Sequence, residues 1–347
     1  MNVHPPLPVV AIVGASGVVG HALIDSLSRR HFPLSELRLL ASARSAGQQL
    51  GFNGNQITVQ ELTNNSFAGV DIAFFAAGAT IAREFVPVAV AAGAQVIDSS
   101  SAFRMRDDIP LVVPEANGHA LQSDAPIVAN PNCIAAILTT ALAPLHARWS
   151  MTRLQLSTYQ AASGGGAAMM DELRDGTQAV LDGKDFTPQV LPHPYAFNFF
   201  SHNADIDPDT GYNGEELKVI SETRRIFDQP TLPISVTCIR VPVLRAHGMA
   251  VSVRFTDHVN VDSIKTALAK APGVRLVDDP ERNHFPMPSE ASGQEDVLVG
   301  RIRPDLGDPS GRTITMFIVG DQLLKGAAQN AVQIAECLAS RQKSDAA

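Results

Sequence analysis

The hydrophobic positions in the first part of the chain form short apolar runs that alternate with stretches of helical character. From Val9 to about Asp98, the runs VVAIVG, LRLLAS, VDIAFFAAG and QVIDSS are separated by GHALIDSLSRR and AREFVPVAVAAG. Near-continuous apolar strands that alternate with helices are typical of a parallel sheet with both faces covered. The pattern therefore predicts an α/β domain at the N-terminal end.

After Cys133 the apolar runs become longer, and apolar and polar residues partly alternate along them. The runs that predict strands are RLQLSTYQA (153–161), ISVTCIRVPV (234–243), MAVSVRF (249–255), VLVGRIRPD (297–305) and TITMFIVGD (313–321). Helices are expected at 167–181 and 263–271, packed against this sheet. The second part is therefore predicted to be an α+β domain with a mixed or antiparallel sheet.

We place the first domain at residues 1–132 together with about 325–347, because an amphipathic last helix, roughly 325–341, is expected to return to it. The second domain then covers 133–324. The segment 184–212 is rich in Pro, Asn, Asp and aromatic residues, lacks a clear periodicity and is longer than an ordinary connection. It is either a functional excursion or an oligomer contact, and both interpretations stay open.

Composition sets limits on this picture. With 347 residues, of which 45% are hydrophobic and 18% charged, the chain has the size of two ordinary globular domains. No stretch approaches the roughly 20 apolar residues of a membrane-spanning helix, and the run 9–13 is too short for a signal peptide, so we expect a cytoplasmic protein without membrane contact. The net charge of −8 argues against nucleic-acid binding. Any anionic ligand must therefore be held by a few local basic residues.

Glycines mark the turn between the first predicted strand and the first predicted helix. The run GASGVVG (14–20) has the context of a dinucleotide-binding turn, because glycines let a pyrophosphate approach the N–H groups of the helix start. The spacing G-x-x-G-x-x-G is only moderately specific, and a turn without a ligand is the alternative. Its place in the first strand–helix unit favours a Rossmann-like nucleotide site.

The end of the second predicted strand distinguishes between the two nicotinamide cofactors. NAD binders carry an acidic residue there, about 20 residues after the glycines, which binds the ribose hydroxyls. Here the place reads ASARSAG (41–47), with Arg44 between Ser42 and Ser45, and Glu36 lies before the strand. A cation beside hydroxyl groups suits a 2′-phosphate, so NADP is predicted. A solvated loop charge is the alternative for Arg44.

One of the three cysteines stands at a predicted helix start. In the run NPNCIAAIL, Pro131 restrains the entry and Asn132 is a favoured N-cap residue, so Cys133 falls in the first helical turn. The positive end of a helix favours the thiolate, which is the nucleophilic form. Cys238 and Cys337 are interpreted as buried apolar residues. The wide spacing fits neither a disulfide framework nor a metal site, so reduced thiols and no metal are expected.

The second domain offers partners for a nucleophilic thiol. His247 is expected in a connection between two strands, where its side chain can enter a cleft and shuttle protons; a structural histidine is the alternative. Arg240 lies on the same predicted strand face as Ile234, Val236 and Cys238, and a guanidinium on an apolar face needs an anionic partner. A structural carboxylate and a substrate carboxylate both stay open for that role.

Taken together, these residues resemble those of the aspartate-semialdehyde dehydrogenase family. The matching blocks, which run in the family's order, are VAIVGASGVVG (10–20), SARSAG (42–47), IDSSSAFR (97–104), PLVVPEAN (110–117), NPNC (130–133), TYQAASGGG (158–166), GYNGEELKVISETRRI (211–226), IRVPVLRAH (239–247), VGRIRPD (299–305) and GDQLLKGAAQNAVQIAE (320–336). A resemblance that extends along nearly the whole chain is specific.

The resemblance implies reductive dephosphorylation of 4-phospho-L-aspartate to L-aspartate 4-semialdehyde, on the route to lysine, threonine and methionine. Cys133 would form a thioester that NADPH reduces, with His247 as acid/base catalyst and Gln160 orienting the acyl intermediate. The residues implied to hold the substrate are Arg240 for the α-carboxylate, Glu215 for the amino group, and Arg104, Asn132 and Lys218 for phosphate.

The resemblance also implies an NADP site and a homodimer formed through the second domain. The residues implied for the cofactor are Gly14, Ser16, Gly17, Val18, Val19, Ser42, Arg44, Ser45, Ala77, Gly78, Ser163, Gly164 and Gln322. The chain departs from the family's pattern at Ile134, at Gly248-Met249 and at Gln322, where Asn is usual. No departure removes an assigned chemical group, but a glycine at 248 leaves open how firmly the catalytic histidine is held.

Two alternatives stand beside this hypothesis. N-acetyl-glutamyl-phosphate reductases share the fold and the thioester chemistry, but their cysteine stands in a G-C-Y-P-type context that NPNCIAA does not match. A catalytically silent homologue that binds a nucleotide or a partner protein should have lost the thiol, the glutamine, the arginine or the histidine. All four are present here.

Overall fold

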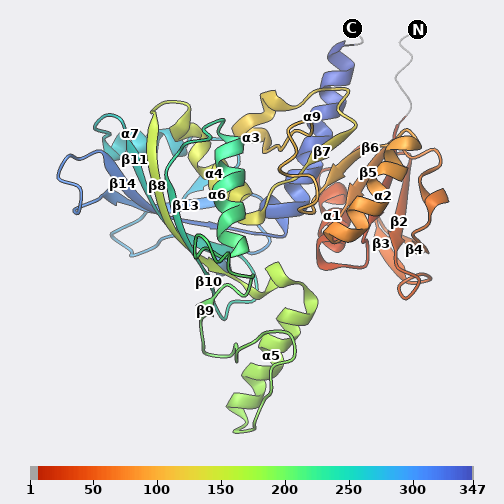
Figure 1. The fold of residues 1–347 in the computed structure, drawn as a ribbon, viewed down its shortest axis with the longest axis horizontal. Coiled ribbons are helices and arrows are strands. Elements are labelled where there is room, and N and C mark those ends of the chain that lie inside the picture. The colour runs from red at the N-terminus through yellow and green to blue at the C-terminus, as the bar shows by residue number, and fades with distance from the viewer. Residues whose placement is uncertain (1–6, 346–347) are drawn as a thin grey trace. The chain divides into compact units, whose positions relative to one another are not determined.

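The computed structural model describes residues 7–345, and the chain divides into two compact units. The first unit runs to Pro131 and resumes at Ala327, and the second comprises Asn132–Gly326. Residues 1–6 and 346–347, which the predicted first domain includes, lie outside the described range. Each unit is built on a sheet of its own (Figure 1).

The sheet of the first unit has seven strands within the described residues, in the order β3-β4-β2-β1-β5-β6-β7. They are β1 (Val9–Val13), β2 (Glu36–Ala41), β3 (Gln49–Phe52), β4 (Asn55–Glu61), β5 (Ile72–Phe75), β6 (Gln95–Asp98) and β7 (Ile127–Ala129). All neighbours are parallel except β3, which forms an antiparallel hairpin with β4. The predicted parallel sheet is confirmed. The hairpin was not predicted, because its residues are mostly exposed and polar.

The strand order determines on which face of the sheet the crossover helices of this unit lie. α1 (Val18–Arg29) and α2 (Ala79–Ala91) are the two crossovers that the sequence predicted, and α9 (Gln329–Asp345) packs beside α1. Because the strand order reverses at β1, right-handed crossovers place α1 and α2 on opposite faces of the sheet. Ligands of such sheets bind at the carboxyl ends of the strands where the order reverses, here β1 and β5. The shorter elements are α3 (Pro114–Asn117) and the 3-10 turns Asn64–Phe67 and Gly118–Ala120.

The sheet of the second unit is mixed, as predicted, and within the described residues it has seven strands in the order β12-β13-β14-β11-β8-β10-β9. They are β8 (Met151–Gln160), β9 (Phe200–Ser201), β10 (Ile234–Arg240), β11 (His247–Phe255), β12 (Val274–Leu276), β13 (Val297–Pro304) and β14 (Thr313–Gly320). Three helices, α4 (Cys133–His146), α6 (Gly214–Ile226) and α7 (Val261–Leu268), pack on one face. The remaining elements are the 3-10 turn Ala162–Gly165, α5 (Ala167–Leu181), α8 (Pro288–Ala291) and the π-helical turn Leu324–Ala328.

Two expectations for this unit were wrong. α5 has the predicted bounds but does not pack on the sheet: it projects from it together with the segment that follows (Figure 1). Glu172 of α5 accepts hydrogen bonds from the main-chain N–H groups of Gln189, Val190 and Leu191, which ties the two together. His247 does not lie in a connection; it is the first residue of β11.

No helix within the described range is both long and apolar enough to cross a membrane. No group of three or more His, Cys, Asp and Glu side chains in the same range has an arrangement that could hold a metal ion.

Candidate active site

The glycine turn after β1 is shaped by main-chain contacts. Gly14 has φ +85°, and a Cβ at this position would lie 2.8 Å from the carbonyl oxygen of Ala76. A Cβ at Gly20 would lie 2.3 Å from the carbonyl oxygen of Gly14. Both positions need glycine, because a side chain would collide with main-chain atoms. The turn therefore brings the end of β1 against the residues that follow β5.

Helices α1 and α2 both begin without a side-chain cap. Their N-cap residues are Gly17 and Gly78, and neither helix start has a side-chain cap hydrogen bond or an acidic residue in its first turn within the described chain. The first-turn N–H groups, including those of Val18 and Val19, have no acceptor inside their own helix. Two such helix starts at neighbouring strand ends suit the phosphate groups of a dinucleotide.

The loop after β2 is joined to the glycine turn by a pair of hydroxyl groups. Ser16 Oγ donates to Ser45 Oγ at 3.1 Å, while Arg44 beside them is exposed. Glu36 lies at the opposite end of β2, where it pairs with Arg38 at 2.6 Å. The carboxyl end of β2 therefore offers a cation and hydroxyls. The predicted cofactor residues of this unit lie in, or directly after, the loops that follow β1, β2 and β5: Gly14, Ser16, Gly17, Val18, Val19, Ser42, Arg44, Ser45, Ala77 and Gly78.

Arg104 follows β6 in the first unit, and main-chain carbonyl groups direct its guanidinium. Nε donates to the carbonyl oxygen of Asn130 at 2.9 Å, and Nη2 donates to that of Ser99 at 2.7 Å. Ser99 comes directly after Asp98, a carboxyl group whose pKa is raised by burial. Arg104 is thereby anchored at the carboxyl end of β6.

Cys133 is the first residue of α4, as the sequence predicted, and it is half-buried. The side-chain oxygen of Asn132 accepts hydrogen bonds from the N–H groups of Ile134 at 2.9 Å and Ala135 at 3.3 Å, which caps the helix. A Cβ at Gly326 would lie 2.9 Å from the Cβ of Cys133. The thiol therefore stands at the positive end of a capped helix, against a position that suits only glycine.

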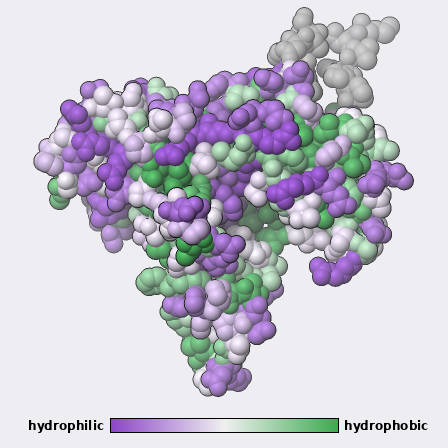
Figure 2. All heavy atoms as spheres, viewed as in Figure 1, coloured by the Kyte–Doolittle hydropathy of each residue, from purple (hydrophilic) through white to green (hydrophobic). Residues whose placement is uncertain are grey.

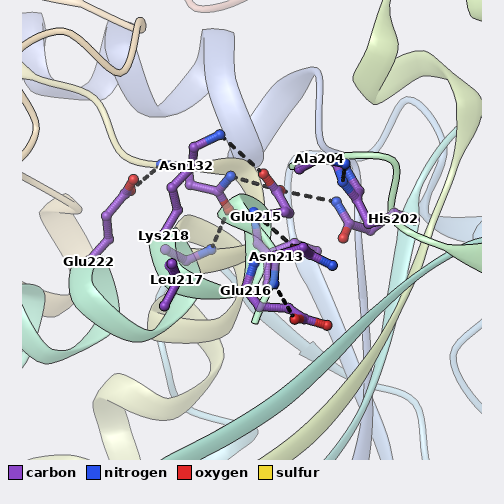
Figure 3. Close-up of polar contacts among 12 residues, drawn as sticks. Asn132, His202, Ala204, Asn213, Glu215, Glu216, Leu217, Lys218 and Glu222 are labelled. Carbon is purple, nitrogen blue, oxygen red and sulfur yellow. Dashed lines mark hydrogen bonds and ion pairs between the residues drawn. The ribbon is translucent and has the colours of Figure 1, made fainter. Parts of the chain in front are cut away.

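A network of buried polar groups connects the cap of α4 with α6 (Figure 3). Asn132 Nδ2 donates to Glu215 Oε1 at 2.9 Å, and Gln160 Nε2 donates to the same oxygen at 3.1 Å. Lys218 Nζ lies 3.6 Å from Glu215 Oε2. The Asn132 N–H donates to Glu222 Oε2 at 2.5 Å. Three of the predicted substrate residues thus surround one carboxylate.

Glu215 is ionised at neutral pH although it is buried. Burial raises the pKa of this carboxyl group, but the charge that His202 gains when it is protonated in acid, hydrogen bonds from two side-chain amides and the Lys218 ammonium outweigh burial and hold the pKa below its usual value. Burial, then the charge of Arg240, lowers the pKa of His202 to about 4. The cluster therefore holds a carboxylate and an ammonium beside a neutral imidazole.

Gln160, Arg240 and His247 meet because of the order and direction of three strands. β8 lies between β10, to which it is parallel, and β11, to which it is antiparallel. Gln160 and Arg240 are register partners at the ends of β8 and β10, and β11 begins at the same edge. The next residue, Ala161, contacts both neighbours: its N–H donates to His247 Nδ1 at 2.9 Å, and its carbonyl oxygen accepts from Arg240 Nη1 at 3.5 Å.

His247 is fully buried, and the contact with Ala161 fixes its tautomer. Because Nδ1 accepts an N–H, the proton of the neutral ring is on Nε2. Burial, then the charge of Arg240, lowers the pKa of His247 to about 3, so the ring is neutral at physiological pH. Nε2 is buried and has no hydrogen-bond partner within the described part of the chain. It is therefore a donor that a ligand can satisfy.

Arg240 is a buried cation whose protein partners are neutral. It is 5% exposed and lies on the buried face of β10, as predicted. Nε donates to Asn203 Oδ1 at 3.2 Å. Among the side chains that the structure describes, those of residues 7–341, the polar contacts of Arg240 are Asn203 and the carbonyl of Ala161, and no carboxylate pairs with it. The sequence left two partners open for Arg240, a structural carboxylate and a substrate carboxylate. The described chain supplies no structural carboxylate, and a buried guanidinium needs an anion, so the substrate carboxylate is the partner that stays open.

The remaining predicted cofactor residues, Ser163, Gly164 and Gln322, surround His247 in the second unit. Gln322 Nε2 donates to Ser163 Oγ, and Gln322 Oε1 accepts the N–H of Ala246 at 2.9 Å. Ala246 has φ +72°, an unfavourable conformation for a residue with a Cβ. A Cβ at Gly164 would lie 3.1 Å from His247 Nε2. All three residues therefore help to position the histidine.

Gly248, one of the departures from the family's pattern, does not leave empty space beside the histidine. A Cβ at this position would lie 3.0 Å from Cζ of Phe317, so the phenyl ring occupies the room that a side chain would need. His247 is held from the other side by Ala161 and, through the preceding residue, by Gln322.

Several residues of this region were not found from the sequence: Ala161, His202, Glu222 and Gly326. Ala161 acts through its main chain and Gly326 through the absence of a side chain, and no residue pattern reveals either. The N-terminus of α6 did have a signal, since Asn213 and Glu216 form a capping box with the spacing N-x-x-E.

Two family profiles match most of the chain. The profile described as "Semialdehyde dehydrogenase, NAD binding domain" matches residues 9–124. The profile described as "Semialdehyde dehydrogenase, dimerisation domain" matches residues 142–325.

The proteins to which this chain is similar share the name aspartate-semialdehyde dehydrogenase. The aspartate-semialdehyde dehydrogenase of Synechocystis sp. is 47% identical over 337 residues, which cover 97% of this chain and 99% of that protein. Aspartate semialdehyde dehydrogenase II of Vibrio cholerae, solved in complex with ASA, has a TM-score of 0.93 at 37% identity and covers 97% of this chain and 99% of its own. The Candida albicans enzyme, solved with NADP, shares the fold at a TM-score of 0.75 and 24% identity, with 97% and 99% covered. These names favour the principal hypothesis over an N-acetyl-glutamyl-phosphate reductase.

Proposed function

This chain belongs to the aspartate-semialdehyde dehydrogenase family, and from that premise we propose that it catalyses the NADPH-dependent conversion of 4-phospho-L-aspartate to L-aspartate 4-semialdehyde and phosphate. One observation carries the proposal. Within the described residues, Arg240 has no carboxylate partner and His247 Nε2 has no hydrogen-bond partner, and both side chains touch Ala161. A substrate with a carboxylate and a reacting carbonyl oxygen would satisfy both groups.

NADP is proposed to bind at the glycine turn and at the loops after β2 and β5. The uncapped starts of α1 and α2 suit the pyrophosphate, and Arg44 with Ser45 suits the 2′-phosphate. The Candida albicans relative was solved with this cofactor. When bound, the reduced nicotinamide supplies the hydride that the acyl carbon accepts.

Cys133 is proposed as the nucleophile. Its thiolate attacks the acyl carbon, the C–S bond forms and the C–O bond to phosphate breaks, so that phosphate leaves and a thioester remains. The start of α4 stabilises the thiolate, and the Asn132 cap holds that helix end in place. After the acyl carbon has been reduced, the C–S bond breaks, which returns the thiolate and releases the aldehyde.

His247, which the family resemblance implies as the acid/base group, is proposed to act on the acyl oxygen. Its Nε2–H can donate a hydrogen bond to this oxygen and stabilise the negative charge that the oxygen gains when hydride is transferred. When the electron pair of that oxygen re-forms the carbonyl, the C–S bond breaks and the thiolate leaves, so this step needs no proton from the ring. The ring is neutral with its proton on Nε2 and therefore acts as a hydrogen-bond donor.

The remaining polar residues are proposed to recognise the substrate. Arg240 would bind the α-carboxylate, and Glu215, ionised although buried, would bind the α-amino group. Gln160, whose amide bonds Glu215 and Thr158, would orient the acyl group. Asn132 and Lys218 are proposed for the phosphate group, and the same role is proposed for Arg104 on the family resemblance alone.

The direct test is the phosphate-dependent reduction of NADP with L-aspartate 4-semialdehyde. Wild-type protein is expected to be active and Cys133→Ser to lose detectable turnover, while Cys337→Ser, at a half-buried cysteine of the other unit, stays active. Full activity in Cys133→Ser would contradict the thioester. An inactive wild type would reject the function and favour the silent homologue.

The choice of cofactor has a test of its own. Arg44→Ala is expected to raise the KM for NADP about tenfold, the loss of roughly one charge-assisted contact, while the KM for NAD stays unchanged. A wild-type enzyme that prefers NAD would contradict the role given to Arg44.

A homodimer is proposed as the assembly. The profile of the dimerisation domain matches residues 142–325 of the second unit, and Figure 2 shows apolar side chains on the projection that α5 and the following segment form. Exposed apolar side chains of this projection are Val180, Leu181, Val190, Phe197, Phe199 and Ile206. A second copy of the chain would cover part of this surface.

A further inference from the structure

The segment 184–212, whose role the sequence left open, passes beside Arg240. β9 pairs antiparallel with β10, so that Phe200 lies opposite Arg240. The pairing continues in the hydrogen bond from the His202 N–H to the Cys238 carbonyl oxygen at 2.9 Å. This brings the next residue, Asn203, to the guanidinium, where its Oδ1 accepts the Nε–H at 3.2 Å.

The contacts of Arg240 decide which of its donors stay available. A guanidinium has one N–H on Nε and two on each Nη. Asn203 takes the Nε donor, and the carbonyl oxygen of Ala161 faces Nη1 at 3.5 Å. The edge formed by Nε and Nη2 is therefore closed to a ligand. Nη1 carries two N–H groups and the Ala161 contact uses one of them, so the fork between Nη1 and Nη2 is the bidentate site that remains for a carboxylate.

We propose that Asn203 is a positioning residue that directs the Nη1–Nη2 fork of Arg240 toward the α-carboxylate of the substrate. This role rests on the proposed function. An amide suits the place, because its oxygen fixes the guanidinium without neutralising it, whereas a carboxylate would form an ion pair and compete with the substrate. The neighbouring His202 is neutral, since burial lowers its pKa to about 4, and adds no charge.

Asn203 can be replaced without disturbing the core, because the residue is exposed. Asn203→Ala is expected to raise the KM for L-aspartate 4-semialdehyde about tenfold, with kcat and the KM for NADP unchanged, because a contact to a charged group is lost in ground state and transition state alike. Asn203→Asp should raise this KM further, since its carboxylate would pair with Arg240. Asn198→Ala is the matched control, an exposed amide of the same segment that bonds the Pro194 carbonyl and is expected to keep wild-type constants.

A substrate without the carboxylate separates positioning from a general structural role. With 3-aminopropanal, which lacks the α-carboxylate, Asn203→Ala and wild type are expected to have the same kcat/KM. Equal losses on both aldehydes, or a fall in kcat with unchanged KM, would overturn this role while leaving the proposed function intact. A wild type without activity on L-aspartate 4-semialdehyde would reject the function itself and this role with it.

Discussion

Ala161 holds two proposed catalytic side chains through its main chain alone. Its N–H determines which nitrogen of His247 carries the proton, and its carbonyl oxygen faces the guanidinium of Arg240. The residue types of the site could be read from the sequence, because a cysteine at a helix start and an arginine on an apolar strand face are unusual. The contacts of Ala161 could not, since every residue has the same main-chain groups.

A methyl group at position 164 is expected to displace the catalytic ring. A Cβ there would lie 3.1 Å from both Cε1 and Nε2 of His247, and the buried ring has little room to move. Gly164→Ala should therefore lower kcat several-fold, because the ring must shift by a few tenths of an ångström and a misplacement of roughly 1 Å would cost about a hundredfold, with the fold retained by circular dichroism. Gly118→Ala, where a Cβ meets nothing within 4 Å, is the control. An unchanged kcat in Gly164→Ala would show that the ring is not confined at this point.

The two neutral histidines make the protein sensitive to acid. Burial lowers the pKa of His247 to about 3 and that of His202 to about 4, whereas unfolded histidine titrates near about 6.5. Below that value the unfolded chain binds more protons than the folded one, so the free energy of unfolding falls as pH falls from about 6.5 toward about 4, by up to about 1.4 kcal/mol per pH unit for each ring. Above about pH 6.5 both histidines are neutral in the folded and the unfolded chain, so their contributions to the free energy of unfolding no longer change with pH.

Urea unfolding at a series of pH values checks this expectation. In His247→Gln the free energy of unfolding should depend less steeply on pH, because one of the two neutral rings is absent. His21→Gln, at an exposed histidine, is the control and should keep the wild-type dependence. A wild-type free energy of unfolding that stays level between about pH 6.5 and about pH 5 would contradict the neutral rings.

Two helices that begin with Asn and two that begin with Gly have different proposed roles in the site. α4 and α6 start with Asn132 and Asn213, whose side chains satisfy the first N–H groups and fix the direction of the helix. α1 and α2 start with Gly17 and Gly78, which leave those groups for phosphate. The Asn caps of α4 and α6 therefore position side chains of the site, whereas α1 and α2 offer main-chain N–H groups to a ligand.

Loss of the cap of α6 is expected to affect catalysis as well as stability. Asn213→Ala removes the acceptor for the N–H groups of Glu215 and Glu216 and should cost about 1 kcal/mol of stability. Because Glu215 stands in that first turn, the KM for L-aspartate 4-semialdehyde should rise as well. Asn260→Ala removes the equivalent cap of α7, which holds Asp262, and should cost a similar stability with unchanged kinetics. Identical kinetics in the two variants would show that the cap does not position Glu215.

The apolar periodicity predicted α1, α2, the bounds of α5 and the long strands of the second unit, because each buries a continuous face. The periodicity did not predict features that depend on tertiary packing or on a turn. α5 has a helical pattern, yet Met169 and Leu173 pack against Leu191 and Tyr195 of the following segment instead of the sheet. The hairpin of β3 and β4 has few apolar residues, and its pairing is set by the turn at Asn53-Gly54, where both residues have positive φ.

On the scale of the whole molecule, the two sheets follow from two patterns in the sequence. Continuous apolar strands form the parallel sheet of the first unit, and partly alternating strands form the mixed sheet of the second. The alternation leaves polar side chains on the less covered face of the second sheet. The order of strands could not be read from either pattern, because periodicity determines which face is buried and not which strand is the neighbour.

Self-association is expected to depend on the projection of the second unit. Phe197 and Phe199 are 69% and 71% exposed, a costly arrangement for side chains of that size in water. The double variant Phe197→Ser and Phe199→Ser should weaken the proposed dimer by at least about tenfold in Kd, measured by sedimentation equilibrium, with the fold retained. Leu306→Ser, 98% exposed but outside the projection, is the control. An unchanged Kd in the double variant would place the interface elsewhere.

The return of α9 to the first unit sets the order in which the protein can mature on the ribosome. The strands of the first sheet are synthesised first, but the helix that packs beside α1 is made only after Gly326. The whole second unit, by contrast, lies in one continuous stretch and can fold as it emerges. We therefore expect nascent chains arrested after residue 326 to hold a protease-resistant second unit beside a protease-sensitive first one. The nucleotide-binding half, begun first, would be the last to become competent.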